Sequence, residues 1–292
     1  MKTILIFLFA MIPAMACAAD YPPHEKLVYK EAADQKTGGT VQLKLHVYQP
    51  DGFQVTDKRP AIVFFFGGGW NGGDPKQFYQ QADFFARQGF VAFSADYRVK
   101  SRNKTTPFEC VKDGKSAIRW VRQHAAELGV DPDRIVASGG SAGGHVAACT
   151  GMIEGCEETD ENLEISSQPN AMILFNPVLD TTQKGYGSKR FKPEQQTDLS
   201  PCHQVVPGIV PTLLLHGTAD TTVPFENAER FTKLMTEHGN ECKLVSFEGK
   251  GHGFFNSPFF RPKTEDLAPY EKGMEASVTF LTKLGYLSAK SP

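Results

Sequence analysis

The clearest chemical signal in the sequence is a serine set among glycines. Residues 134–148 read RIVASGGSAGGHVAA, in which Gly139, Ser141 and Gly143 form the pattern Gly-x-Ser-x-Gly between a strand pattern and a helix pattern of small residues. A serine on such a tight turn exposes its hydroxyl, and the residues two before and two after it must be small to avoid collision. The segment lacks the lysine of a phosphate-binding loop and the acidic residue that marks a dinucleotide fold. We therefore interpret Ser141 as a candidate nucleophile; the alternative is a serine that only caps the helix.

Two polar turns further along the chain carry the partners that a nucleophilic serine needs. Residues 212–224 read TLLLHGTADTTVP, an apolar strand pattern followed by a turn with Asp220. Residues 243–255 read KLVSFEGKGHGFF, in which His252 stands between glycines after another strand pattern. Because a serine hydroxyl is a poor nucleophile until a base removes its proton, we expect His252 to be that base and Asp220 to orient it.

Two other histidines compete for the role of the base. His216 ends a strand pattern before a glycine, and His145 follows the serine turn on the helix pattern. Both positions suit packing or turn roles, whereas the glycines beside His252 offer no packed apolar surface. Asp220 also has an alternative, since aspartates in turns often cap a helix. The prediction is therefore the set Ser141, Asp220 and His252, in that order along the chain.

The segments that must position these residues alternate between strand and helix patterns. Alternating apolar residues at 41–47 predict a half-exposed strand near a sheet edge. Short unbroken apolar runs predict strands covered on both faces at 61–66, 90–96, 134–138, 171–175 and 212–217, with a further strand at 242–247. Apolar residues at helical spacing predict helices at 75–87, 110–128, 225–238 and 270–284. This order predicts the α/β class, with a mainly parallel sheet and helices on both faces.

The N-terminal segment has the layout of a secretory signal. Residues 1–18 contain one early lysine, an apolar run and a small-residue end, and the apolar run is too short for a membrane span. We expect an exported protein, periplasmic or extracellular, and consider lipoprotein anchoring through Cys17 the weaker alternative. Residues 19–292 are expected to form one domain, with an irregular excursion at 180–206.

Composition limits the partners. Hydrophobic residues make up 40% and charged residues 22% of the chain, which predicts a sizeable core, and the formal net charge of -2 comes without a basic stripe for nucleic acid. The six cysteines match no zinc spacing, and if Cys17 is removed an odd number remains, so at least one thiol is unpaired or paired between molecules. No motif for a metal or cofactor is found, and the sequence leaves the oligomeric state open.

These motifs resemble those of a known family. GGSAGG around Ser141, the segment HGTADTTVP and the segment GKGHGFF are similar to α/β-hydrolase serine esterases, in particular to secreted bacterial acetylxylan-esterase and feruloyl-esterase types of the hormone-sensitive-lipase-like group. The likeness covers nearly the whole mature chain. It implies the α/β-hydrolase fold with a central sheet of about eight strands, and a structural Arg98 that pairs with nearby acidic residues.

The resemblance also gives a role to the glycine-rich segment AIVFFFGGGWNGG, residues 61–73. It implies an oxyanion hole formed by the backbone N–H groups of Gly68, Gly69 and Ala142, where side chains would block the substrate. The N–H of Trp70 is the alternative to that of Gly68. Phe66 departs from the family, which has a bracing histidine there, and we expect it to brace the loop by packing against Trp70.

The resemblance, together with the three predicted residues, implies a secreted serine carboxylic-ester hydrolase that needs no cofactor. Its expected substrates are small-molecule or polysaccharide esters with short acyl groups, acetyl above all. One alternative is a serine exopeptidase of the prolyl-oligopeptidase kind, although the N-terminal propeller of those enzymes is missing. The other is a non-catalytic binding protein of the hydrolase fold, although such proteins usually lose the serine or the histidine.

Overall fold

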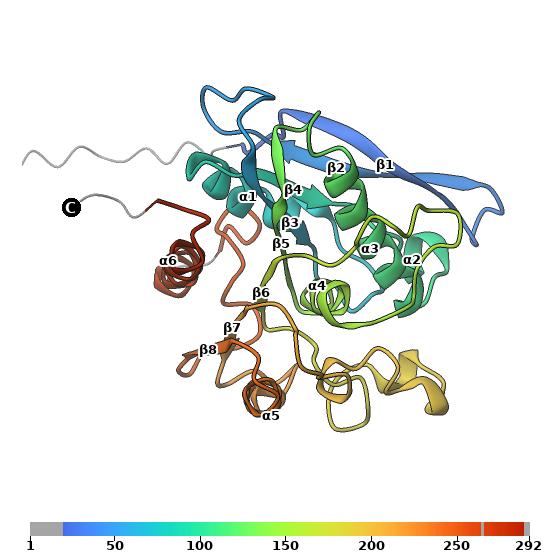
Figure 1. Ribbon diagram of the computed structural model, residues 1–292. Coiled ribbons are helices and arrows are strands. Elements are labelled where there is room, and N and C mark those ends of the chain that lie inside the picture. The colour runs from blue at the N-terminus through green and yellow to red at the C-terminus, as the bar shows by residue number, and fades with distance from the viewer. Residues whose placement is uncertain (1–19, 264–265, 289–292) are drawn as a thin grey trace, which may run out of the picture.

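Eight strands form one sheet in the spatial order β1-β2-β4-β3-β5-β6-β7-β8. The computed structural model describes residues 20–263 and 266–288, so the predicted signal at 1–18 lies outside the described residues (Figure 1). The strands are β1 (Glu25–Ala33), β2 (Thr40–Tyr48), β3 (Arg59–Phe65), β4 (Val91–Ala95), β5 (Val130–Gly140), β6 (Ala171–Phe175), β7 (Thr212–Gly217) and β8 (Cys242–Phe247).

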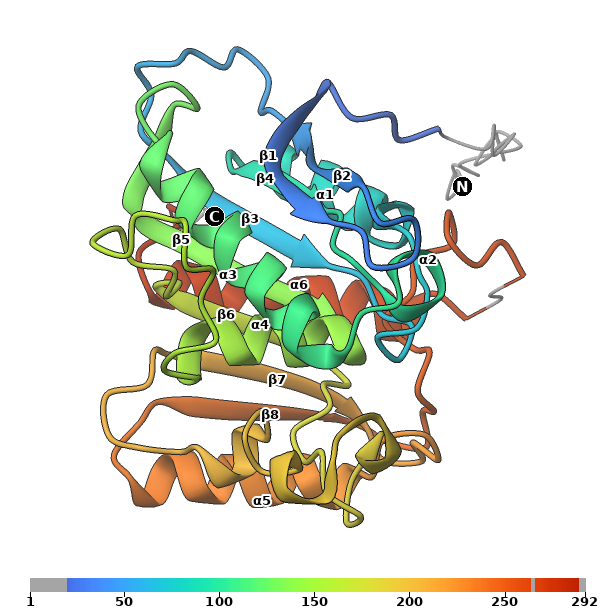
Figure 2. The same cartoon turned by 90° about the vertical axis from the view of Figure 1, so that its right-hand side faces the viewer.

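Strands β3 to β8 form parallel pairs with one another. The pairs β3–β4, β3–β5, β5–β6, β6–β7 and β7–β8 are parallel, whereas β2 is antiparallel to both β1 and β4. The parallel strands therefore end at the same edge of the sheet, to which β3 and β7 point in Figure 2. The predicted fold class and the sheet of about eight strands are confirmed. The edge strand β1 was not predicted. It pairs with the predicted half-exposed strand β2, which is therefore the second strand from the edge.

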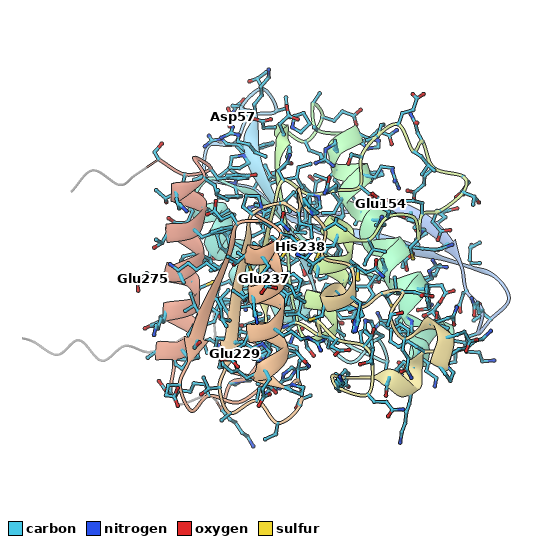
Figure 3. All side chains as sticks on the ribbon, turned by 60° about the horizontal axis from the view of Figure 1, so that its bottom comes forward. Asp57, Glu154, Glu229, Glu237, His238 and Glu275 are labelled. Carbon is cyan, nitrogen blue, oxygen red and sulfur yellow. The ribbon has the colours of Figure 1, made fainter. Side chains whose placement is uncertain are left out.

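The helices pack on both faces of the sheet, and each face has its own apolar cluster (Figure 1). The helices are α1 (Tyr79–Arg87), α2 (Lys100–Asn103), α3 (Pro107–Gln123), α4 (Ala142–Met152), α5 (Phe225–Glu237) and α6 (Ala268–Lys283). One cluster includes residues of α1 and α6, and the other includes residues of α3, α4 and α5. Helix α5 shows the principle: Phe231 and Met235 are buried, whereas Glu229 and Glu237 are exposed (Figure 3).

The central strands are buried on both faces, as the unbroken apolar runs predict. Every residue of β4, β6 and β7 is buried, and in β3 only Arg59 is partly exposed. Strand β2 instead buries Leu43, Leu45 and Val47 and leaves the residues between them, Lys44 and His46, partly exposed. A strand shielded on both faces holds its ends rigidly, and the parallel strands thereby provide fixed supports for the turns that follow them.

Helix α3 differs from its predicted bounds of 110–128. It begins at Pro107 because Thr106 and Glu109 form a capping box, and it ends at Gln123, after which the chain turns. The predicted helix at 75–87 begins instead with one short 3₁₀ helix, η1 (Pro75–Phe78), followed by α1. Within the described residues, no helix combines the length and apolar character needed to cross a membrane.

The excursion predicted at 180–206 lies between β6 and β7. It contains three short 3₁₀ helices, η2 (Ser188–Arg190), η3 (Pro193–Gln195) and η4 (Pro201–His203), and appears in gold in Figure 1. The excursion joins the same apolar cluster as α4, to which it contributes Phe191 and Leu199. It is therefore packed against the domain.

Candidate active site

Ser141 occupies a strained turn between β5 and α4. Its φ is +57° and its ψ is -122°, a backbone conformation that non-glycine residues rarely adopt. A Cβ at Gly139 would lie 2.6 Å from the backbone of Gly143, and a Cβ at Gly143 would lie 2.1 Å from the carbonyl oxygen of Phe65. The small residues expected on both sides of Ser141 are therefore required by the close approach of three backbone segments.

The three residues predicted to act together do meet at the carboxyl edge of the sheet. Ser141 follows β5, Asp220 lies in the turn after β7, and His252 lies in the turn after β8. His252 Nε2 is 2.8 Å from Ser141 Oγ, and His252 Nδ1 is 2.7 Å from Asp220 Oδ2. The side chain of His252 is 23% exposed, so solvent and substrate can reach the imidazole. This chain of hydrogen bonds can move a proton from the hydroxyl to the imidazole.

The carboxylate of Asp220 is fully buried and fully hydrogen-bonded. Its Oδ1 accepts the backbone N–H groups of Thr222 at 2.8 Å and Val223 at 2.9 Å. Burial alone would raise the pKa of Asp220, but hydrogen bonds from His216, His252 and Val223 outweigh it and hold the pKa well below the usual range. Asp220 is therefore ionised at neutral pH.

Two side chains at Asp220 were not predicted to belong to the site. Asn176, which follows β6, donates from Nδ2 to Asp220 Oδ2 at 2.9 Å and to the carbonyl oxygen of His252 at 2.9 Å. His216, expected to serve packing or the turn, lies with Nε2 3.2 Å from Asp220 Oδ2 and 3.1 Å from the carbonyl oxygen of Val223. One signal was available for Asn176: a polar residue directly after a buried parallel strand lies at the edge where such sites form.

The glycine-rich loop lies against the serine turn. A Cβ at Gly67 would stand 2.9 Å from the carbonyl oxygen of Gly140 and 3.2 Å from Ser141 Cβ, so this close approach favours glycine. Gly68 and Gly69 have φ values of +132° and +60°. Among the described residues the backbone N–H groups of Gly68, Gly69 and Ala142 donate no hydrogen bond, which leaves them available to a substrate oxygen.

The loop is braced differently from the expectation. Phe66 stacks on Tyr97 with ring centroids 4.1 Å apart, and the Tyr97 hydroxyl donates to the carbonyl oxygen of Phe66. Trp70 packs instead on His145, and its Nε1–H donates to His145 Nδ1 at 3.3 Å. Phe66 therefore braces the loop by packing, as expected, but its stacking partner is Tyr97.

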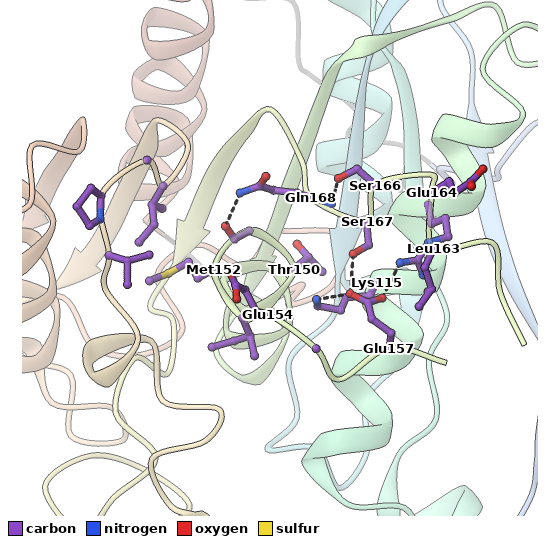
Figure 4. A pocket seen from close by; sticks show the side chains of 18 residues that line it. Lys115, Thr150, Met152, Glu154, Glu157, Leu163, Glu164, Ser166, Ser167 and Gln168 are labelled. Carbon is purple, nitrogen blue, oxygen red and sulfur yellow. Dashed lines mark hydrogen bonds and ion pairs between the residues drawn. The ribbon is translucent and has the colours of Figure 1, made fainter. Parts of the chain in front are cut away.

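A separate pocket of about 460 Å³ lies at the far end of α4 from Ser141 (Figure 4). Its lining includes Lys115, Met152, Glu157 and Gln168 and none of the predicted site residues. Lys115 and Glu157 pair with each other at 2.6 Å, so these two charges already have partners. The chemistry-bearing residues lie at the carboxyl edge of the sheet, and we place the candidate active site there.

Comparisons with known proteins agree with this placement. The family model BD-FAE matches residues 45–186, and the model of the prolyl oligopeptidase family matches residues 168–268. The structure of esterase 2 from Thermogutta terrifontis with bound propionate superposes with a TM-score of 0.85 at 48% identity, covering 94% of this chain and 98% of that one. The same esterase has also been solved with bound butyrate.

Curated relatives are more distant and longer. A probable isoprenylcysteine alpha-carbonyl methylesterase of Arabidopsis thaliana is 28% identical over 72% of this chain and 48% of its own length. An acetylxylan esterase of Xylanibacter ruminicola is 26% identical over 69% of this chain and 42% of its own length. The chain spans about half the length of the first curated relatives it matches. The similarity to esterase 2 is high over its whole length, and on that ground the chain belongs to the α/β-hydrolase serine esterases, hydrolases of carboxylic esters.

Proposed function

We propose that the protein hydrolyses short-chain acyl esters, in particular acetyl esters of carbohydrates, through an acyl-enzyme formed on Ser141. The observation that carries this proposal is the hydrogen-bonded chain from Ser141 through His252 to Asp220, beside a loop whose Gly68 and Gly69 N–H groups donate no hydrogen bond within the described part of the chain. A nucleophile, a base and an orienting acid in this order are what acyl transfer requires.

The reaction follows from the geometry. His252 Nε2 takes the hydroxyl proton of Ser141 as Oγ attacks the ester carbonyl carbon, and the buried Asp220 carboxylate stabilises the imidazolium that forms. N–H groups of the loop and of Ala142 donate to the oxyanion, each contributing about 10²- to 10³-fold in rate. The imidazolium then returns its proton to the leaving alcohol, and a water molecule activated by His252 cleaves the acyl-enzyme in the same way.

The preference for short acyl groups is supported by relatives and by contacts of the excursion. Esterase 2 of Thermogutta terrifontis binds propionate and butyrate, and one curated relative is an acetylxylan esterase. In this chain the Tyr186 hydroxyl lies 2.8 Å from the position of a Cβ on Gly69, so the excursion closes one side of the glycine loop. An ordered side chain beside the oxyanion site restricts the space for a long acyl chain.

Export is a part of the proposal that rests on residues 1–18 alone. A secretory signal would deliver the enzyme to the compartment where polysaccharide esters occur. Cleavage of this segment is checked by N-terminal sequencing of the protein recovered from outside the cytoplasm.

The first test compares Ser141→Ala with Ser138→Ala on a series of p-nitrophenyl esters from acetate to octanoate. Ser138 is buried in β5, and among the described residues its hydroxyl donates one hydrogen bond, to the carbonyl oxygen of Ile173, so it is a matched control three residues away. We expect Ser141→Ala to lose at least about 10⁴-fold in kcat/KM and all labelling by a fluorophosphonate, and Ser138→Ala to keep both. A loss of less than about 10-fold in kcat/KM in Ser141→Ala, with labelling retained, would rule out this nucleophile, and a preference for octanoate would rule out the short-acyl proposal.

Exopeptidase activity is the second candidate, favoured by the match of residues 168–268 to the prolyl oligopeptidase family. Release of acetate from acetylated xylan is compared with cleavage of an aminoacyl-prolyl amide by the same preparation. Faster amide cleavage would favour the peptidase. A protein that the fluorophosphonate fails to label would be the non-catalytic binder.

A further inference from the structure

Asn176 ties together the two turns that carry the predicted acid and base. Its Nδ2 donates to Asp220 Oδ2 and to the carbonyl oxygen of His252, both at 2.9 Å, while its own N–H donates to the carbonyl oxygen of Leu215 in β7. One amide side chain after β6 thus joins the turn after β7 to the turn after β8. The side chain is buried, so these hydrogen bonds do not compete with solvent.

The backbone at Asn176 shows that this position carries a cost. Its φ is +40°, in the region that favours glycine, and asparagine is one of the few side chains that tolerate it. Glycine would satisfy the backbone alone. The residue is instead an asparagine, and both hydrogen bonds donated by its side-chain amide are directed at the candidate site. This indicates that the amide has a functional role there.

His216 supplies a second contact to the same oxygen. Its Nε2 faces two acceptors, Asp220 Oδ2 at 3.2 Å and the carbonyl oxygen of Val223 at 3.1 Å, and therefore carries the hydrogen. The imidazole is fully buried, and its Nδ1 has no partner among the described residues. A buried polar ring with one nitrogen left unsatisfied is costly, which indicates that the other nitrogen has a function.

These contacts surround the acid completely. Oδ2 faces three donors, on His252, Asn176 and His216, and Oδ1 accepts two backbone N–H groups. The charged or titratable groups that contact Asp220 in the described part of the chain are the two histidines, and no Lys or Arg forms an ion pair with it. The Asp220 carboxylate is oriented by amide and imidazole N–H groups and has no neighbouring guanidinium or ammonium among the described residues. Its negative charge therefore remains available to stabilise an imidazolium at His252.

We propose that Asn176 and His216 are positioning residues of the reaction: they hold the Asp220 carboxylate in its orientation toward His252, and Asn176 also fixes the turn that carries His252. This inference rests on the proposed function. It goes beyond the three-residue site, because it makes the reactivity of His252 depend on two side chains that never touch the substrate.

The test for Asn176 uses two variants that separate backbone from amide. Asn176→Gly removes the side-chain amide, and glycine tolerates the positive φ at this position. Asn176→Asp keeps the shape of the side chain but places a second carboxylate beside Asp220. We expect kcat/KM for p-nitrophenyl acetate to fall about 10- to 100-fold in Asn176→Gly and further in Asn176→Asp. Both changes favour a protonated Asp220, so the acid limb of the pH profile of kcat/KM should move to higher pH.

The test for His216 uses rescue. His216→Gln can present an N–H near the position of Nε2, whereas His216→Leu cannot. We expect His216→Leu to lose about 10-fold in kcat/KM with the same shift of the acid limb, and His216→Gln to recover most of the rate. Rates are normalised to the fraction of enzyme titrated by the fluorophosphonate, so incomplete folding does not count as lost reactivity.

Asn240→Asp is the matched control. Asn240 is also buried, and its side chain makes four hydrogen bonds far from the candidate site, with Val206, Gly208, Ile209 and Met235. It should lose stability while keeping the wild-type pH profile. Wild-type rates and acid limbs in Asn176→Gly and His216→Leu, beside a Ser141→Ala variant that has lost about 10⁴-fold in kcat/KM, would overturn this inference alone. Near-wild-type kcat/KM in Ser141→Ala would overturn the proposed function itself.

Discussion

Two buried carboxylates, Asp113 and Asp220, have side chains that are 0% exposed, yet their surroundings differ in kind. Asp113 on α3 pairs with Arg98 at 2.7 Å and with Lys30 at 2.7 Å. Asp220 is surrounded by backbone, amide and imidazole N–H groups. The same side chain is thus buried once among fixed cations and once among dipolar and imidazole donors.

This difference distinguishes a structural carboxylate, Asp113, from the carboxylate proposed to take part in the reaction, Asp220. Lys30 and Arg98 also contact Glu158, so the network joins β1, the chain after β4, α3 and the loop after α4 in one closed cluster of charges. Fixed cations cancel the charge of Asp113 permanently. In the proposed reaction, the cation beside Asp220 arises only when His252 takes a proton, and the orienting groups leave the carboxylate free to stabilise it.

The largest effect is expected from Asp220→Asn. The asparagine keeps the shape but offers an N–H where His252 Nδ1–H needs an acceptor, so the imidazole adopts the wrong tautomer. We expect kcat/KM to fall about 10⁴-fold, measured with p-nitrophenyl acetate at pH 7. A loss below about 10-fold would remove Asp220 from the mechanism. The same change at Asp113 should leave kcat/KM per labelled site at the wild-type value.

Asp113→Asn is expected to lower the free energy of unfolding. Removing one partner leaves Arg98 and Lys30 buried with only Glu158 to compensate them, which costs about 3 to 5 kcal/mol. Urea unfolding followed by fluorescence measures the difference. A loss of less than about 1 kcal/mol would mean that the ion pairs of Asp113 do not stabilise the fold, which would contradict the structural role given to Asp113.

The sequence predicted the three site residues because each follows a strand pattern within a short motif. Parallel strands that are buried on both faces end at one edge, so local patterns around Ser141, Asp220 and His252 were enough to predict that they meet. Arg98 was likewise predicted to pair with acids, and it pairs with Asp113 and Glu158.

Other features depend on contacts between distant segments, which a local pattern does not encode. Asn176 acts on residues 44 and 76 positions away, and its positive φ has no sequence signature beyond a tolerant residue type. The stacking of Phe66 on Tyr97 is also set by tertiary packing. The early start of α3 is different, because the pattern Thr106-x-x-Glu109 was visible in the sequence as a capping box.

The smallest expected effect is a loss of stability in acid, in which His145 titrates at a higher pH than Asp220. His145 is fully buried, accepts from Trp70 at Nδ1 and lies with Nε2 2.7 Å from the carbonyl oxygen of Leu199, and burial lowers its pKa from 6.5 to about 4. Between these values the unfolded chain binds a proton that the native protein does not, so stability falls as the pH falls, by about 3 kcal/mol in total.

The lowered pKa of Asp220 affects stability in a lower pH range than that of His145. A carboxylate with a depressed pKa stabilises the native state above its unfolded value of about 4, and that contribution is lost only as the pH falls through the native value. We therefore expect His145→Gln to flatten the decline in unfolding free energy between pH 6.5 and 4, while Asp220→Asn leaves this slope unchanged. His46, whose pKa burial also lowers to about 4, keeps its part of the slope in both variants. Urea unfolding at pH 7, 6, 5 and 4 measures the slopes, and an undiminished slope in His145→Gln would show that the proton is taken up elsewhere.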